Sequence, residues 1–193
     1  MLDFAVLGLL HESPMHGYEL RKRLNALLGT FRAFSYGSLY PTLRRMKLAG
    51  WISETDSDAS GAPVLTGRRG RVVYRLTADG KERFAEMLAD VEPATTGDEQ
   101  FGVRFAFFAK TDAEVRLRIL EGRRRRVEEK RDGLRAALAR TRQRLDRYTL
   151  ELQEHGLEAV DREVRWLSEL IDTERRELQA RPVSRDEHPD QPS

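Results

Sequence analysis

The segment 35–52 reads SYGSLYPTLRRMKLAGWI, and its pattern predicts a capped amphipathic helix. Ser35 is a suitable N-cap, across which Phe34 and Leu39 can form a hydrophobic staple. Gly50 supplies the left-handed residue that commonly ends a helix. On a helical wheel three apolar side chains share one side: Leu39, Leu43 and Met46. This side is expected to pack against a protein core.

The opposite side of this helix is cationic, because Pro41, Arg44 and Arg45 point away from the apolar side chains. Hydroxyl groups gather toward its N-terminal end, where a helix in the DNA major groove presents side chains to base edges and phosphates. They belong to Ser38, Tyr40 and Thr42. The pattern favours a DNA recognition helix. The alternative is an ordinary amphipathic helix with a solvated basic face, and the segment alone leaves it open.

The flanking segments place this helix in a larger arrangement. Residues 2–10 form an apolar run, and residues 18–29 carry leucines at helical spacing before a terminal Gly29. Downstream, residues 51–54 and 72–77 are rich in strand-forming residues and enclose a long tip that carries Arg68, Arg69 and Arg71. The order helix, helix, basic helix and two-stranded wing is typical of a winged helix-turn-helix domain, whose wing contacts the DNA backbone or minor groove.

Five short motifs in this order resemble the PadR family of bacterial transcriptional regulators over roughly the first 90 residues. They are Leu7-Gly8-Leu9-Leu10, Met15-His16-Gly17-Tyr18-Glu19-Leu20, Gly37-Ser38-Leu39-Tyr40-Pro41-Thr42-Leu43, Gly50-Trp51-Ile52 and Tyr74-Arg75-Leu76-Thr77. The resemblance implies a dimeric, mostly repressing DNA-binding protein with C-terminal helices for dimerisation. It also implies that a small aromatic or multidrug effector can release the DNA. The chain departs from the family pattern at residues 56–66, which enlarge the short wing tip.

The composition is typical of a nucleic-acid-binding protein with long solvated helices, since 34% of the 193 residues are charged and 39% are hydrophobic. The first 85 residues carry a net charge of +5 and the remaining 108 carry −3. Cysteine is absent, which excludes disulfides, thiol nucleophiles and cysteine-ligated metals. No apolar run approaches the roughly 20 residues that span a bilayer. We therefore expect a cytoplasmic protein with no membrane partner.

The second half of the sequence predicts a helical hairpin. A helix over 78–88 closes the winged domain, and the break at 93–97 divides a winged helix-turn-helix domain (1–92) from a helical dimerisation domain (98–180) and a disordered tail (181–193). After an aromatic helix over 101–108, heptad-like runs on both sides of His155-Gly156 predict two long helices joined by a glycine turn. A second copy of the chain can cover their apolar seam. The alternative is a monomeric hairpin that packs on itself.

The expected fold class is therefore mainly α with a small β-hairpin wing. For groove contacts we select Tyr36, Ser38, Tyr40, Thr42 and Arg44, for phosphates Arg45 and Lys47, and for the wing Arg68, Arg69 and Arg71, with Ser35 and Pro41 at the helix start completing the set. Candidate effector contacts are Phe101, Phe105, Phe108, Tyr148 and Trp166. For these aromatics, ordinary packing in a dimer core is the favoured interpretation.

The sequence lacks the residue patterns that a metal site or an enzymatic active site needs. None of the four histidines has a second ligand at helical spacing, and no nucleophile has a neighbouring base, so we expect no metal, no cofactor and no enzymatic activity. The run Arg123–Arg126 is interpreted as a solvated helix face rather than a DNA contact. The main rival function is a non-DNA-binding helical adaptor, which needs no basic face on the helix at 35–48. The expected mechanism is a homodimer that places two such helices in successive major grooves of a pseudo-palindromic operator.

Overall fold

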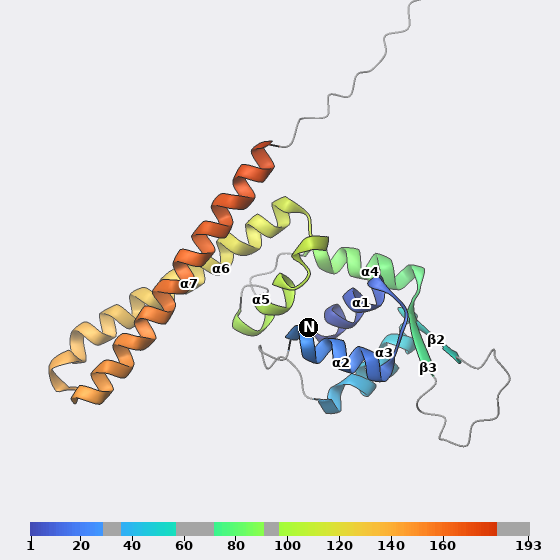
Figure 1. Ribbon diagram of the computed structural model, residues 1–193, viewed down its shortest axis with the longest axis horizontal. Coiled ribbons are helices and arrows are strands. Elements are labelled where there is room, and N and C mark those ends of the chain that lie inside the picture. The colour runs from blue at the N-terminus through green and yellow to red at the C-terminus, as the bar shows by residue number, and fades with distance from the viewer. Residues whose placement is uncertain (29–35, 57–71, 91–96, 181–193) are drawn as a thin grey trace, which may run out of the picture. The chain divides into compact units, whose positions relative to one another are not determined.

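The computed structural model describes residues 1–28, 36–56, 72–90 and 97–180, which form two compact units, Met1–Val115 and Arg116–Ser193 (Figure 1). The predicted fold class is confirmed, since the described chain is mostly helical with one small antiparallel sheet. No helix in these ranges is long and apolar enough to cross a membrane.

The first unit contains a helical core and the strands of the wing. Its elements are α1 (Leu2–Glu12), β1 (Met15–His16), α2 (Gly17–Leu28), the 3-10 turn η2 (Tyr36–Ser38), α3 (Leu39–Leu48), β2 (Ile52–Asp56), β3 (Val72–Leu76), α4 (Ala78–Ala89), α5 (Asp98–Phe105), the 3-10 turn η5 (Phe108–Lys110) and the first residues of α6 (Ala113–Thr141). The three helices and the hairpin that the sequence predicts up to residue 77 are all present.

The sheet has the strand order β1-β3-β2, and both pairings are antiparallel. In the predicted hairpin, Ile52 lies opposite Leu76 and Asp56 opposite Val72. The two-residue strand β1 pairs Met15 with Tyr74. It was not predicted, because two residues are too few to show an alternating pattern. It ties the start of α2 to the base of the wing.

The core of the first unit centres on α1, which is apolar around its whole circumference and is buried from Phe4 to Leu10. The ring centroid of Phe4 lies 5.4 Å from that of Phe84 and 5.3 Å from that of Phe107. Phe107 follows α5, so this segment packs with the winged domain. The packing boundary at Val115 therefore lies later than the break that the sequence predicts at 93–97, and the functional division at residues 92 and 98 stays a prediction.

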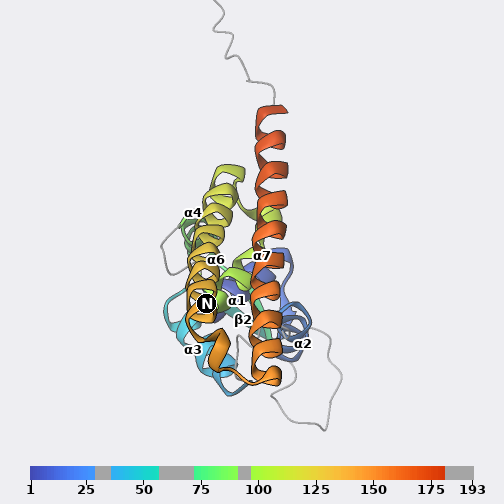
Figure 2. The same ribbon diagram turned by 90° about the vertical axis from the view of Figure 1, so that its left-hand side faces the viewer.

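The second unit is an antiparallel hairpin, in which α6 and α7 (Arg147–Ala180) lie side by side in both views (Figures 1 and 2). The predicted turn at His155-Gly156 is wrong, because both residues lie inside α7. The chain turns instead through η6 (Arg142–Arg144) and Asp146. The Asp146 carboxylate accepts hydrogen bonds from the Tyr148 and Thr149 amides at 2.9 and 3.0 Å and from the Thr149 hydroxyl at 2.5 Å. Asp146 is thus the N-cap of α7.

Ion pairs across the hairpin explain the polar residues in its seam. Arg116 donates two hydrogen bonds to Glu174, at 2.9 and 2.7 Å, and the buried Arg123 donates to Glu163. Glu174, a polar residue in the seam of α7, is thus held in a half-buried bidentate pair. Arg123 belongs to the run 123–126 and pairs within the hairpin rather than lying on a solvated face. The buried apolar residues of α7 flank these pairs: Val160, Val164, Leu167 and Ile171.

Acid is expected to remove the contribution of the Asp146 cap. Hydrogen bonds from the Thr149 hydroxyl and amide hold the pKa of Asp146 below its ordinary value. The folded pKa is the lower one, so the cap stabilises the unit at neutral pH, and this contribution is lost as the pH falls through the folded pKa. Urea unfolding should therefore show Asp146→Ala less stable than the parent at about pH 7, and the two much closer at about pH 3. The signal is Trp166 fluorescence in a Trp51→Phe background, since the chain has two tryptophans. A stability difference that stays constant between the two pH values would contradict this role.

Candidate nucleic-acid interface

The inner side of α3 is buried in the first unit, as the wheel predicts for Leu39, Leu43 and Met46. Thr42 is also buried, with 7% of its surface exposed. The prediction that Thr42 faces a DNA groove is therefore wrong. Its position three residues after Leu39 and four before Met46 places it on the apolar side of the helix. The hydroxyl suggested a DNA contact, but the helical spacing decides where the side chain points.

The residues at both ends of α3 are ones that helix termini favour. The helix begins at Leu39 after η2, so Pro41 is its third residue, where a missing amide costs no helical hydrogen bond. At the other end Gly50 has φ of 76°, as predicted. The Gly50 amide donates to the Lys47 carbonyl and the Trp51 amide to the Met46 carbonyl, each at 3.0 Å, which is the Schellman arrangement.

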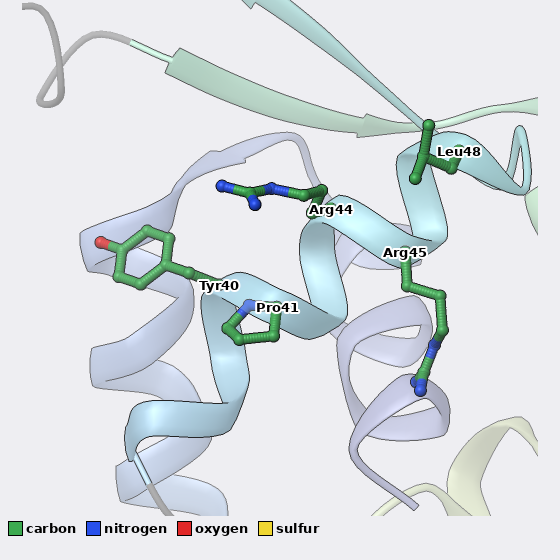
Figure 3. A pocket seen from close by; sticks show the side chains of 5 residues that line it. All are labelled: Tyr40, Pro41, Arg44, Arg45 and Leu48. Carbon is green, nitrogen blue, oxygen red and sulfur yellow. The ribbon is translucent and has the colours of Figure 1, made fainter.

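The outer side of α3 carries a shallow hollow lined by five residues (Figure 3). They are Tyr40, Pro41, Arg44, Arg45 and Leu48. Tyr40 is 57% and Leu48 83% exposed, and Pro41 and both arginines are exposed as well. Figure 3 shows the Arg44 guanidinium extending toward the same side of the helix as the Tyr40 ring, whereas Arg45 extends the opposite way. Four of the five were predicted as site residues, and Leu48 was missed.

Two of the predicted phosphate-binding cations form ion pairs with carboxylates. Arg45 forms an ion pair with Asp3 at the start of α1, and Lys47 forms one with Glu54 of β2. Within the ranges that the structure describes, Arg44 makes no ion pair. Arg44 is therefore the α3 cation whose charge is most accessible to a ligand, while Arg45 and Lys47 must share theirs with acidic neighbours.

Two tyrosines pack against the start of α2 and support the N-terminal half of α3. A Cβ atom on Gly17 would lie 3.5 Å from the Tyr40 ring and 3.4 Å from the Tyr74 ring, so both rings lie against the backbone there. Burial raises the pKa of the Tyr74 phenol, and the Glu54 carboxylate and Tyr40 raise it further, so this hydroxyl stays neutral and able to donate. The adjacent Tyr18 is 74% exposed. It was not selected from the sequence, although an aromatic in the first turn of the preceding helix was a usable signal.

The remaining predicted DNA contacts are placed only in part. Ser38 is half-buried at the N-cap position of α3, where its side chain makes no cap hydrogen bond. The backbone of Tyr36 belongs to η2. Ser35 and the wing residues Arg68, Arg69 and Arg71 lie outside the described residues, as does most of the enlarged wing tip. The described strands of the wing carry the chain toward that tip from Asp56 and back from Val72.

Three of the five predicted effector residues come together. The Phe105 ring centroid lies 4.9 Å from that of Phe108 and 5.7 Å from that of Phe101. Tyr148 and Trp166 belong to the second unit, where Tyr148 is 82% exposed. The three phenylalanines thus form an aromatic cluster at α5 and η5, and an effector site that also includes Tyr148 and Trp166 stays a prediction.

A family model and two curated relatives are similar to this chain. Residues 6–86, which contain α3 and the described strands of the wing, match the model of the transcriptional regulator PadR-like family. The chain is 28% identical over 117 residues to the probable transcriptional regulator Rv1176c of Mycobacterium tuberculosis, covering 61% of this chain and 58% of the relative. It is 25% identical over 93 residues to the negative transcriptional regulator PadR of Bacillus subtilis, covering 48% of each. The chain thus spans about half the length of the curated relatives that it matches.

Two solved structures are also similar to the chain. One is Bacillus subtilis PadR in complex with operator DNA, at 19% identity and a TM-score of 0.43, covering 90% of this chain and 98% of the other. The second is smu.1604c from Streptococcus mutans, at 23% identity and a TM-score of 0.41, covering 92% and 98%.

Proposed function

We propose that this protein is a PadR-like transcriptional regulator, a homodimeric repressor that binds operator DNA through α3, because residues 6–86 match the model of that family. The observation that carries the proposal is that α3 is buried on one side and exposed on the other. Its inner side is anchored in the core by Leu43 and Met46, and its outer side exposes Arg44, Arg45 and Tyr40. A helix so held can enter a major groove about 12 Å wide without unfolding the domain.

The second unit is proposed to join two copies of the chain. Tyr148 and Leu152 are largely exposed near the start of α7, and a matching α7 would remove their apolar surface from water. Two-fold symmetry then places the two α3 helices about one helical turn of DNA apart, or a multiple of it, on a pseudo-palindromic operator. The repressing role is supported by the name of the Bacillus subtilis relative, a negative regulator.

The proposed effector site is the aromatic cluster at α5 and η5. The cluster of Phe101, Phe105 and Phe108 is the candidate site for a small aromatic ligand, as the resemblance in sequence implies, and the alternative is ordinary packing of the three rings. Titration of the full-length protein with phenolic acids, read by the loss of bound duplex, separates the two. Release of DNA at ligand concentrations that leave a Phe105→Ala variant bound would support an effector site.

The main test is selection of bound fragments from a random duplex pool by the full-length protein, followed by mass measurement in solution. We expect a motif with two-fold symmetry, a dimeric mass for the free protein and two chains on each duplex. Binding should weaken steeply with salt, because cations on the protein replace counterions on the phosphates. Failure to bind any duplex at low salt would overturn the proposal, and a monomeric mass with an asymmetric motif would overturn its dimeric form.

Asp3→Asn is expected to strengthen binding to duplexes of any sequence by several-fold. The change frees Arg45 from its ion pair, so that its full charge can meet a phosphate. The slope of log K against log salt should become steeper by about 0.9, the value for one added phosphate contact. The matched control is Glu86→Gln, which adds the same unit of charge by freeing Arg83 on α4 instead. Equal slopes in the two variants would show that Asp3 does not compete with the phosphate.

A further inference from the structure

The outer side of α3 alternates apolar and cationic residues along its axis. Pro41, Arg44 and Leu48 follow the 3-4 spacing that aligns side chains on one helix face. Leu48 is 83% exposed, and both it and Pro41 line the hollow that also contains the two guanidinium groups (Figure 3). With a rise of about 1.5 Å per residue, Pro41 and Leu48 lie about 4.5 and 6 Å from Arg44 along the helix axis.

These apolar residues need an explanation, because phosphate binding does not use them. Single exposed leucines are common on protein surfaces, but here the leucine and the proline flank the one α3 arginine without an ion pair in the described part of the chain. A ligand that complements this surface must carry apolar groups close to negatively charged or acceptor groups. The major groove of DNA does so at each thymine, whose 5-methyl group lies among base acceptors between two rows of phosphates.

We propose that Pro41 and Leu48 contact the 5-methyl groups of thymines on the two sides of the base pair that Arg44 reads. The inference rests on the proposed function of α3 as the recognition helix, and it adds the chemical feature that is recognised. Since base pairs are stacked about 3.4 Å apart, the thymines should lie one or two steps from the base pair of Arg44. A half-site is then expected to contain thymine on both sides of a guanine.

Deoxyuridine tests this directly, because it lacks only the 5-methyl group of thymidine. A duplex obtained by the selection described above is resynthesised with each thymine replaced singly by deoxyuridine, and the Kd of the full-length protein is measured for each. Loss of one buried methyl should weaken binding about fourfold at one or two positions in each half-site. The other thymines of the duplex serve as internal controls.

The contact is assigned to its residues by a double-mutant cycle. Leu48→Ala should weaken binding to the thymine duplex but remove the sensitivity to deoxyuridine at one position, and Pro41→Ala should do so at another. Leu48→Ile, which keeps a branched apolar side chain, should retain the sensitivity. Since Leu48 is exposed, the variants are expected to fold, and circular dichroism checks this.

The outcomes separate this inference from the function on which it rests. If deoxyuridine is tolerated at every position of a duplex that still binds, α3 does not read methyl groups and the inference fails, while DNA binding stands. Sensitivity that persists unchanged in both Leu48→Ala and Pro41→Ala also overturns it, because other side chains then make the contact. If no duplex binds at all, the proposed function itself fails.

Discussion

Arg44→Ala is expected to weaken binding to the selected operator by about 1 to 3 kcal/mol, which is roughly 5- to 150-fold in Kd. Arg44 is exposed on the outer side of α3, and among the described residues no carboxylate pairs with it. Its guanidinium can therefore donate two hydrogen bonds to the O6 and N7 atoms of a guanine. Because the contact proposed for Arg44 is to a base, preference at one base pair should relax along with the affinity.

Two companion variants separate base reading from charge. Arg44→Lys keeps the positive charge but not the planar pair of donors, so we expect it to retain non-specific binding and still lose discrimination at that base pair. Arg125→Ala removes an arginine of α6 that is also exposed, and it should change neither property. The measurement is a titration of each variant against the operator and its single-base variants at one fixed salt concentration. A uniform loss over all sequences would assign Arg44 to a phosphate instead of a base.

Features determined by neighbouring residues could be predicted from the sequence. The apolar side of α3, the positive φ of Gly50 and the strands at 52–56 and 72–76 all follow from spacing within a few residues. The error at Thr42 had a different origin. The chemistry of its hydroxyl was given more weight than its place on the wheel, although burial beside Leu43 follows from the same periodicity that predicted the helix.

Features that depend on distant residues could not be predicted. The ion pair of Arg45 with Asp3 joins residues 42 positions apart, and that of Arg116 with Glu174 joins residues 58 apart. The hairpin turn shows the same limit. A glycine inside a helix costs only about 1 kcal/mol relative to alanine, so burial of Val160 and Val164 after Gly156 and the cap at Asp146 together outweigh it. The glycine therefore did not mark the end of a helix.

Gly80→Ala is expected to destabilise the first unit by about 3 kcal/mol, near the upper end for overpacking. Gly80 lies in the first turn of α4, and a Cβ there would overlap the carbonyl oxygen of Trp51 and lie 2.9 Å from Leu76 Cδ1. The obstacle is backbone, which cannot rotate away as a flexible side chain can. Thr77 also fixes the start of α4 against the backbone at Gly50 and Trp51. Its hydroxyl donates to the Gly50 carbonyl at 2.6 Å, and its amide donates to the Trp51 carbonyl at 3.1 Å.

Gly156→Ala is the matched control, because a Cβ at Gly156 meets nothing within 4 Å. Inside a continuous α7 this change should stabilise the second unit by up to about 1 kcal/mol. Urea unfolding followed by Trp51 in a Trp166→Phe background reports the first unit, and Trp166 in a Trp51→Phe background reports the second. If Gly156→Ala were instead less stable than the parent, Gly156 would have the left-handed backbone conformation of a glycine that ends a helix.

The close contact of Gly80 with the Trp51 backbone is also expected to affect DNA binding. Helix α3 ends at Leu48 and β2 of the wing begins at Ile52, so the Trp51 backbone that the new methyl group would displace lies in the segment that joins the two. Gly80→Ala should therefore weaken operator binding even at temperatures where the variant is fully folded. Gly156→Ala should leave that affinity unchanged, and this contrast separates a shift of the wing relative to α3 from a general loss of stability.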